Sequence, residues 1–318
     1  MVKRKKVGVA LSGGGSKGIA HIGVLKILEE YNVPIDFISG TSMGSVIGAL
    51  YCSGYSLKKI EYLFTEEEKG WKKLLDYTFP KHGLIKGKKI ENFIEDELKN
   101  IKFKDLEIPL YVTSFDIDDR REIVFNRGSV SKAVRASISI PGMIVPVENK
   151  NRILVDGGIV DPIPTEVLKK KGAEIIIAVN VDEKKKKSIK FEKAVEKKGK
   201  KKIPGIWDIA SKSFKAMSHE IYMYDLTKKG IDFIIHVPTR NKEILSFSKK
   251  ANKQTIKDGE KAAEKSLEKI QKATKPHPFK DFLESLTMVD EKIKKETSKT
   301  LPLGKTLVKD KKKKSGKK

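Results

Sequence analysis

The sequence is poor in the features that hold secreted and membrane-spanning proteins together. Cys52 is the only cysteine among 318 residues, so no disulfide bond can form within the chain, which is typical of a reducing compartment. No run of about 18 apolar residues is present, which argues against a membrane-spanning helix. The apolar run at residues 7–11 is too short for a secretory signal. We therefore expect a soluble cytoplasmic protein and exclude collagen-like chains and disulfide scaffolds.

Acidic residues are scarce relative to basic ones, and the imbalance lies in the second half of the chain. The sequence has 67 Lys and Arg against 42 Asp and Glu, a formal net charge of +25. Residues 1–180 hold 28 basic and 23 acidic residues, whereas residues 181–318 hold 39 and 19. This excess is either a solubility feature or an attraction for an anionic membrane surface or a nucleic acid. Aromatic residues do not interleave with the lysine runs, so no nucleic acid partner is expected.

Short apolar runs alternate with helical patterns along most of the chain. Strands are predicted at residues 7–11, 37–39, 110–115, 122–125, 153–155, 174–181 and 231–237. Helices are predicted at residues 19–31, 45–52, 131–137, 164–171, 206–228 and 248–271, and most of 55–110 has a helical pattern. Strands that alternate with helices form parallel sheets covered on both faces. The sequence therefore predicts an α/β fold with three layers, a mostly parallel sheet flanked by helices.

The composition divides the chain into a large domain and a basic extension. We expect the domain at residues 1–272, with its motifs in 7–171 and a lysine-rich surface loop at 182–202. The extension at 273–318 is predicted to be an amphipathic helix followed by a disordered tail. Its apolar side chains recur at helical spacing: Phe279, Phe282, Leu283, Leu286, Val289 and Ile293. This helix either lies on a membrane or packs on the domain or on another subunit, as in a homo-oligomer.

A glycine-rich loop follows the first predicted strand and opens the first predicted helix. It consists of Gly13, Gly14, Gly15, Ser16, Lys17 and Gly18. Consecutive glycines let backbone N–H groups converge at a helix start, where a phosphate or a developing oxyanion can bind. The loop also matches the dinucleotide fingerprint, but Asp36 precedes the second strand instead of ending it. On its own the loop does not show whether it binds a phosphate, an oxyanion or a dinucleotide.

Two further motifs come directly after predicted strands. Gly40-Thr41-Ser42-Met43-Gly44 is the G-x-S-x-G pattern that places a serine on a sharp turn, although a helix-capping serine has the same setting. Asp156-Gly157-Gly158 puts an aspartate at the carboxyl end of a strand, where open sheets place functional groups, although Asp-Gly also occurs in plain turns.

Together with the block at residues 136–141 (Ala-Ser-Ile-Ser-Ile-Pro), these motifs resemble one family in content and order. Patatin-like phospholipases carry a GGGx[RK]G loop, G-x-S-x-G, A-S-x-S-x-P and DG[GA] in the same order along the chain. The likeness extends to about residue 271. Lys17 stands where arginine is frequent in the family. The closest resemblance is to small bacterial members.

The resemblance implies a serine acyl hydrolase that cleaves carboxylic esters of phospholipids or related lipids without metal or cofactor. Ser42 would be the nucleophile and Asp156 the general base of a Ser–Asp dyad. The glycine loop would form the oxyanion and substrate-binding site, through Gly13, Gly14, Gly15, Lys17 and Gly18. The glycines at 40, 44, 157 and 158 would shape the turns. Such a protein would act in the cytoplasm and associate peripherally with an anionic membrane.

Two alternatives stay open at this point. A Ser–Asp–His triad would use His219 or His236, which follow Asp156 in the order of α/β-hydrolases. A non-catalytic regulator would keep the fold and bind lipids or partners. The segment 55–110 is expected to cover the site and shape an acyl pocket, because apolar residues gather there, such as Leu63, Trp71, Leu74 and Phe79.

Overall fold

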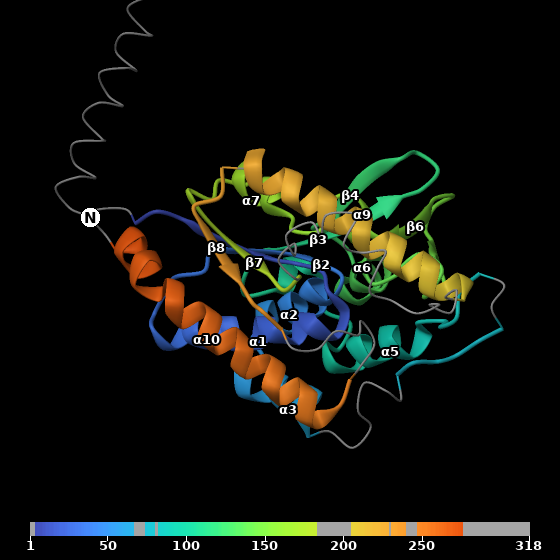
Figure 1. The fold of residues 1–318 in the computed structure, drawn as a ribbon, viewed down its shortest axis with the longest axis horizontal. Coiled ribbons are helices and arrows are strands. Elements are labelled where there is room, and N and C mark those ends of the chain that lie inside the picture. Colours follow the sequence, from blue (N-terminus) through green and yellow to red (C-terminus); the bar gives the residue numbers. More distant parts are fainter. Residues whose placement is uncertain are drawn as a thin grey trace, which may run out of the picture. The chain divides into compact units, whose positions relative to one another are not determined.

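The computed structural model describes residues 4–66, 74–79, 82–182, 205–228, 230–239 and 247–275. Lys5–Lys275 form one compact unit, in which helices flank both faces of a central sheet (Figure 1). The predicted three-layer α/β fold is confirmed. The predicted loop at 182–202, apart from Asp182, and the predicted helix at 279–295 lie outside the described residues, so the division at residue 272 stays a prediction.

The sheet has eight strands in the order β5-β6-β3-β2-β1-β7-β8, with β4 paired to β3. Their bounds are β1 Val7–Leu11, β2 Phe37–Thr41, β3 Leu110–Asp116, β4 Arg121–Phe125, β5 Val147–Glu148, β6 Ile153–Asp156, β7 Ile175–Asn180 and β8 Phe233–His236. The strands β3, β2, β1, β7 and β8 are parallel neighbours, whereas the pairings of β4, β5 and β6 are antiparallel. Only β5 was not predicted, because two residues are too few to leave an apolar pattern.

Strand β3 arranges its neighbours in a way that matters for the site. Its residues Val112 and Thr113 pair with both β2 and β4, and its residue Ser114 pairs with both β4 and β6. A strand has only two edges, so β2 and β6 share the edge opposite β4. Because β2 is parallel and β6 antiparallel to β3, the carboxyl ends of β2 and β6 meet beside the middle of β3.

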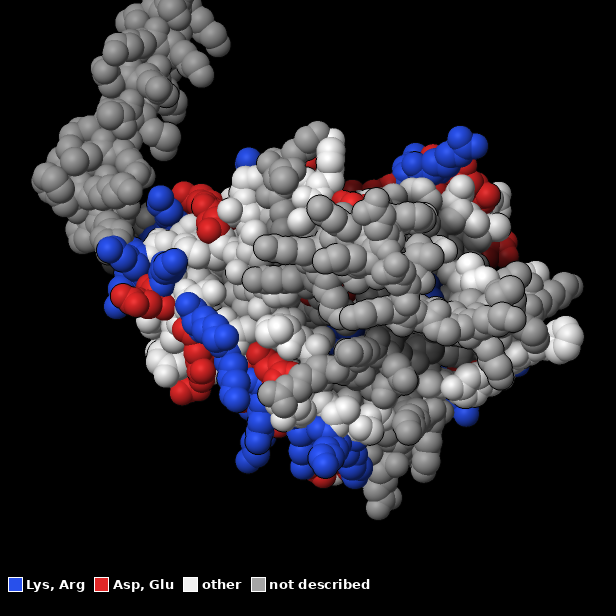
Figure 2. All heavy atoms as spheres, in the orientation of Figure 1, with Lys and Arg blue, Asp and Glu red and all other residues white. Residues whose placement is uncertain are grey.

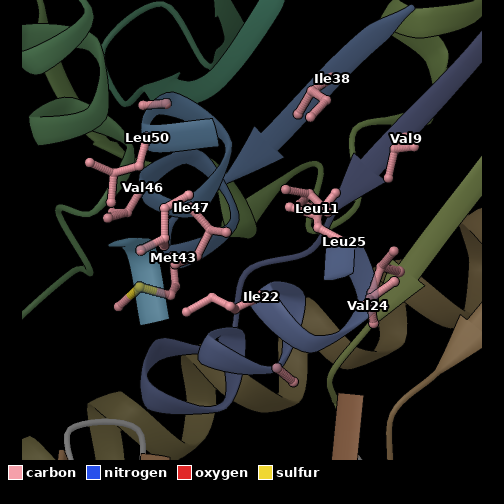
Figure 3. Close-up of a cluster of buried hydrophobic side chains, with 14 of the residues drawn as sticks. Val9, Leu11, Ile22, Val24, Leu25, Ile38, Met43, Val46, Ile47 and Leu50 are labelled. Atoms are coloured by element: carbon pink, nitrogen blue, oxygen red, sulfur yellow. The ribbon is translucent and has the colours of Figure 1, made fainter. Parts of the chain in front are cut away.

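The helices form two layers. Their bounds are α1 Ala20–Glu30, α2 Met43–Cys52, α3 Leu57–Thr65, α5 Lys88–Glu97, α6 Val130–Ser137, α7 Thr165–Lys170, α9 Ile206–Lys228 and α10 Lys249–Thr274, with 3-10 helices η1 Gly15–Ile19, η2 Phe103–Asp105 and η3 Gly157–Ile159. The larger apolar core joins one sheet face to α1, α2, α3, α5, α6 and α10. Figure 3 shows the part of this core that lies between β1, β2, α1 and α2. A smaller core joins the other face to α7 and α9.

Alternation along the strands explains both cores. Val7, Val9 and Leu11 of β1 point into the larger core, whereas Ala10 points into the smaller one. Strands buried on both faces are continuously apolar, which is why the sequence pattern located them. Among the described residues no helix combines the length and the apolar character needed to cross a bilayer.

Part of the basic excess lies in a row on α10. Its exposed lysines follow a four-residue repeat and line the solvent side of the helix (Figure 2): Lys253, Lys257, Lys261, Lys265 and Lys269. The opposite side of α10 packs against α1 and belongs to the larger core. The row is therefore a solvated face of a structural helix.

Candidate active site

Ser42 stands at the turn between β2 and α2 in a strained backbone conformation. Its φ of 53° and ψ of −124° are rare for a residue with a side chain, and such strain persists only where the surroundings impose it. The two flanking glycines allow this turn. A Cβ on Gly40 would lie 2.6 Å from the backbone of Gly44, and one on Gly44 would lie 2.2 Å from the carbonyl oxygen of Leu11. The sharp turn expected from G-x-S-x-G is present.

A second serine fixes this turn. The Ser42 N–H donates to Ser137 Oγ at 2.8 Å, and the Ser137 hydroxyl donates to the carbonyl oxygen of Thr113 at 2.6 Å. Ser137 closes helix α6 and is fully buried. Ser137 belongs to the block at residues 136–141, for which the sequence suggested no chemical role. That role depends on a hydrogen bond to a residue 95 positions away, which a local sequence pattern does not reveal.

We expect Ser137→Ala to lower kcat about tenfold with little change in KM, because a buried N–H left without an acceptor costs about 1–3 kcal/mol and loosens the Ser42 turn. Steady-state hydrolysis of a soluble ester measures this effect. The matched control is Ser131→Ala on the same helix, where another buried serine pairs with Ser129 instead of the turn. An equal loss in both variants would mean that α6, and not the bond to Ser42, is responsible.

Asp156 ends β6 and turns its carboxyl group into the protein. Its side chain is 1% exposed, and Oδ1 accepts the N–H of Gly158 at 2.8 Å. Burial raises the pKa of Asp156 from 3.8 to about 7, and hydrogen bonds from Ser42 and Gly158 act in the opposite direction. At neutral pH this carboxyl is therefore poised to gain or lose a proton.

Ser42 and Asp156 meet because their strands end on the same edge of β3. Thr41, the last residue of β2, pairs with Thr113, and Asp156 pairs with the next residue, Ser114. The Ser42 side chain is close enough to lower the pKa of Asp156 as a hydrogen-bond donor. The buried Oδ2 nevertheless has no well-aligned hydrogen bond among the described residues. Long or bent contacts of this kind are common in catalytic sites without substrate.

The glycine loop lies against Ser42. A Cβ on Gly13 would be 3.4 Å from Ser42 Cβ, and the N–H of Gly13 donates to the Pro162 carbonyl at 3.1 Å. Gly14 and Gly15 have φ values of 151° and 56°. Their N–H groups have no acceptor among the residues that the structure describes. Gly13 thus has its donor occupied, while the next two glycines have theirs available beside the serine.

The other glycines of the motifs serve close packing or the turn at the acid. A Cβ on Gly18 would lie 2.6 Å from Met43, and one on Gly157 would lie 2.6 Å from the Thr113 carbonyl oxygen. Gly158 supplies the N–H that Asp156 Oδ1 accepts, and it also lines the cavity described below. Gly18 and Gly157 do not line that cavity.

Lys17 is buried in the cavity wall. Its ammonium lies 3.9 Å from Asp182 Oδ1, and Asp182 Oδ2 lies 2.9 Å from Nδ1 of His219. The Lys17 side chain is only 2% exposed, so its ammonium is stabilised by protein groups such as the Asp182 carboxylate and not by solvent. Its assignment as a substrate-binding group stays a prediction.

No histidine in the described part of the chain completes a triad with Asp156. His219 contacts Asp182, and His236 lies 3.1 Å from the Asn180 side chain. His21 is fully buried, with Nε2 2.8 Å from the Ser12 carbonyl oxygen, and burial lowers its pKa to about 4. His21 is therefore a neutral core residue.

A cavity of about 80 Å³ surrounds Ser42 and Asp156. The glycine loop, Ile140, Ile163 and three residues of α9 line it: Phe214, Ser218 and Tyr222. The expectation that 55–110 would shape this pocket is wrong for the described residues, since none of them lines it. Leu63 lies in the larger core, Phe79 is 85% exposed, and Trp71 lies outside the described residues. A wider groove of about 900 Å³ between β4, β5 and α6 contains neither Ser42 nor Asp156.

Comparison with known proteins places these motifs in one family. The family model described as "Patatin-like phospholipase" matches residues 9–169, about half of the chain. The chain is 34% identical over 185 residues to lysophospholipase NTE1 of Debaryomyces hansenii, covering 57% of this chain and 12% of that protein. It is 33% identical over 185 residues to neuropathy target esterase sws of Drosophila melanogaster, covering 55% and 13%. The chain thus spans about an eighth of these relatives.

A solved structure has the same fold. VipD from Legionella pneumophila superposes with a TM-score of 0.50 at 16% identity, covering 84% of this chain and 67% of that one. The matched family region, residues 9–169, contains all four motifs together with Ser42 and Asp156. The chain belongs to the patatin-like phospholipase family.

Proposed function

We propose that this protein is a serine acyl hydrolase that cleaves carboxylic ester bonds of lipids through Ser42 and Asp156. The observation that carries the proposal is the convergence of a strained serine and a buried aspartate, whose pKa is raised to about 7, in one cavity lined by the glycine loop. A serine hydroxyl is a weak nucleophile until a neighbouring base accepts its proton. A carboxylate with a pKa near 7 is a far better base at neutral pH than an ordinary aspartate.

The reaction follows from these positions. Ser42 Oγ bonds to the ester carbonyl carbon while its proton passes to Asp156 Oδ2. The negative charge that develops on the carbonyl oxygen is met by the N–H groups of Gly14 and Gly15. The bond to the alcohol then breaks, and the proton passes from Asp156 to the departing oxygen. Water repeats the sequence on the acyl-enzyme, releases the fatty acid and restores Ser42.

A lipid substrate is supported by family membership and by the names of the relatives, one a lysophospholipase and one an esterase. The cavity has a mostly apolar lining that suits an acyl chain. We also propose peripheral contact with a membrane, supported by the net charge of +25. Residence in the cytoplasm and self-association remain predictions of the sequence.

The test is labelling with a fluorophosphonate probe followed by peptide mapping, together with hydrolysis of lysophosphatidylcholine and of p-nitrophenyl butyrate. We expect label on Ser42 alone and turnover of both esters, since the probe reacts only with an activated serine. Label on another serine would overturn the assignment. Absence of both label and turnover would favour a non-catalytic regulator that keeps the fold.

A further inference from the structure

Helix α9 forms one wall of the catalytic cavity. Its residues Phe214, Ser218 and Tyr222 recur every four positions and therefore form one stripe, and all three line the cavity. Tyr222 is buried in the smaller core, and Ser218 Oγ donates to the carbonyl oxygen of Gly158 at 2.6 Å. Figure 1 shows α9 lying across the sheet face opposite α1 and α10.

The covered cavity is too small for a lipid. Its volume of about 80 Å³ has room for a few water molecules. Sites that enclose drug-sized ligands measure about 300–1,000 Å³. An ester with a long acyl chain therefore needs more room beside Ser42 than the cavity provides, and movement of part of the wall would supply it. The wall consists of α9, the glycine loop, the ends of strands and residues of the connecting loops, among them Ile140 and Ile163.

The contacts that the structure describes between α9 and the domain lie along one side of the helix. Among the described residues, α9 has substantial backbone proximity only to η3. Its polar ties to the domain, within the same residues, include the bond from Ser218 to Gly158 and the contact from His219 to Asp182 at 2.9 Å. By comparison, α10 packs along the whole of α1 and contributes several side chains to the larger core. A helix held along one side separates from the domain at a lower cost than a strand of the central sheet.

The solvent side of α9 carries large apolar side chains between its polar ones. Ile209 is 47% exposed, Met217 48%, Met223 37% and Tyr224 58%. On a helix of 3.6 residues per turn these four positions lie away from the stripe of Phe214, Ser218 and Tyr222. We call Ile209, Met217, Met223 and Tyr224 the outer face. Four large apolar side chains exposed on one helix mark a surface that has a partner.

We infer that the outer face of α9 is the surface through which this protein docks on a phospholipid bilayer, and that docking draws α9 away from the catalytic cavity. The inference rests on the proposed function. Two observations support it. One side of α9 lines the cavity, and the outer face exposes large apolar side chains. A bilayer both buries those side chains and holds the substrate, so that opening occurs where substrate is present.

The composition of the outer face favours a zwitterionic bilayer over a strongly anionic one. Among the side chains of α9 that the structure describes, the exposed charges are one of each sign, Lys212 and Glu220. The lysine row of α10 lies on a different helix, and an anionic lipid surface would attract that row whether or not α9 docks. Phosphatidylcholine vesicles therefore isolate the contribution of α9 from that of the net charge.

The test compares the double variant Ile209→Ser, Met217→Ser with the control Tyr31→Ser, Tyr62→Ser, in the full chain. The control removes side chains of similar exposure, 43% and 53%, from the end of α1 and from α3. Each is assayed for hydrolysis of soluble p-nitrophenyl butyrate and of phosphatidylcholine vesicles. Vesicle flotation is measured in a Ser42→Ala background.

We expect the α9 variant to lose at least about tenfold in vesicle hydrolysis and in vesicle binding, because each exchange removes apolar area that the bilayer would bury. Hydrolysis of p-nitrophenyl butyrate should stay within about twofold, and the control variant should match the wild type in all assays. An equal loss on both substrates, unchanged vesicle binding, or a changed oligomeric state in place of changed binding would overturn the inference. If no variant hydrolyses any ester, the proposed function fails, and flotation still decides whether α9 docks.

Discussion

Replacing Ser42 by alanine is expected to lower kcat/KM for p-nitrophenyl butyrate by at least about 10⁴-fold, because loss of a nucleophilic serine removes covalent catalysis altogether. The remaining rate would come from the N–H groups of the glycine loop acting on bound ester with water as nucleophile. The fold should survive. Alanine has the same Cβ as serine, and the Ser42 bond that fixes the turn is made by its backbone N–H to Ser137.

The control for this experiment is Ser53→Ala, at the other end of α2. Its hydroxyl donates to the Leu50 carbonyl, and Ser53 is not among the residues that line the cavity. We expect full activity and full probe labelling of this variant, whereas Ser42→Ala should show neither. Residual turnover of Ser42→Ala above about one percent of the wild-type rate would point to a different nucleophile.

Much of the fold was predictable because each core strand is buried on both faces. Strands such as Val7–Leu11 and Ile175–Asn180 are continuous apolar runs, and glycine or polar residues end them. The position of Ser42 was predictable for a local reason, since glycines on both sides of a serine after a strand imply a sharp turn. Neither inference needs to know which strands are neighbours.

The meeting of Ser42 with Asp156 was not predictable from local pattern. It depends on β6 running antiparallel along the same edge of β3 that β2 occupies. Nothing in Ile153–Asp156 encodes that direction, and only the family resemblance suggested the pair. The same holds for Ser137, whose hydroxyl reaches the Ser42 turn from a distant helix.

The wall of the cavity shows where apolar pattern misleads. Leu63 was expected to shape the pocket, but it packs in the larger core with the rest of α3. The residues that do line the pocket from a helix, Phe214 and Tyr222, lie in a segment whose apolar residues occur on two sides. A helix with two apolar faces has no single stripe, so its role could not be read from periodicity.

Replacing Asp156 by asparagine is expected to abolish turnover while making the protein more stable at alkaline pH. Asparagine keeps the shape of the side chain and can still accept the Gly158 N–H, but it cannot take the Ser42 proton. We expect kcat/KM at about pH 8, where the wild-type carboxylate is ionised, to fall at least about 10³-fold, since a positioned base contributes about 10²–10⁴-fold. In the wild type, kcat/KM should fall about tenfold per pH unit below pH 7 and level off above it, because only the ionised carboxylate is a base.

Stability should change in the opposite sense. The pKa of Asp156 is raised from 3.8 to about 7 in the folded state, so folding favours the protonated form. The stability that this proton provides is complete below about pH 4 and is lost as the pH rises through about 7. The amide of the Asp156→Asn variant never ionises, so the variant should be more stable than the wild type at about pH 8, by at most about 4 kcal/mol, and similar to it near pH 4. Urea unfolding at both pH values measures the difference. A carboxyl group retained only for structure would give a variant that is less stable at the alkaline pH, and a surface carboxyl would give no difference. A variant that is both inactive and more stable at about pH 8 therefore identifies Asp156 as a buried acid whose role is proton transfer.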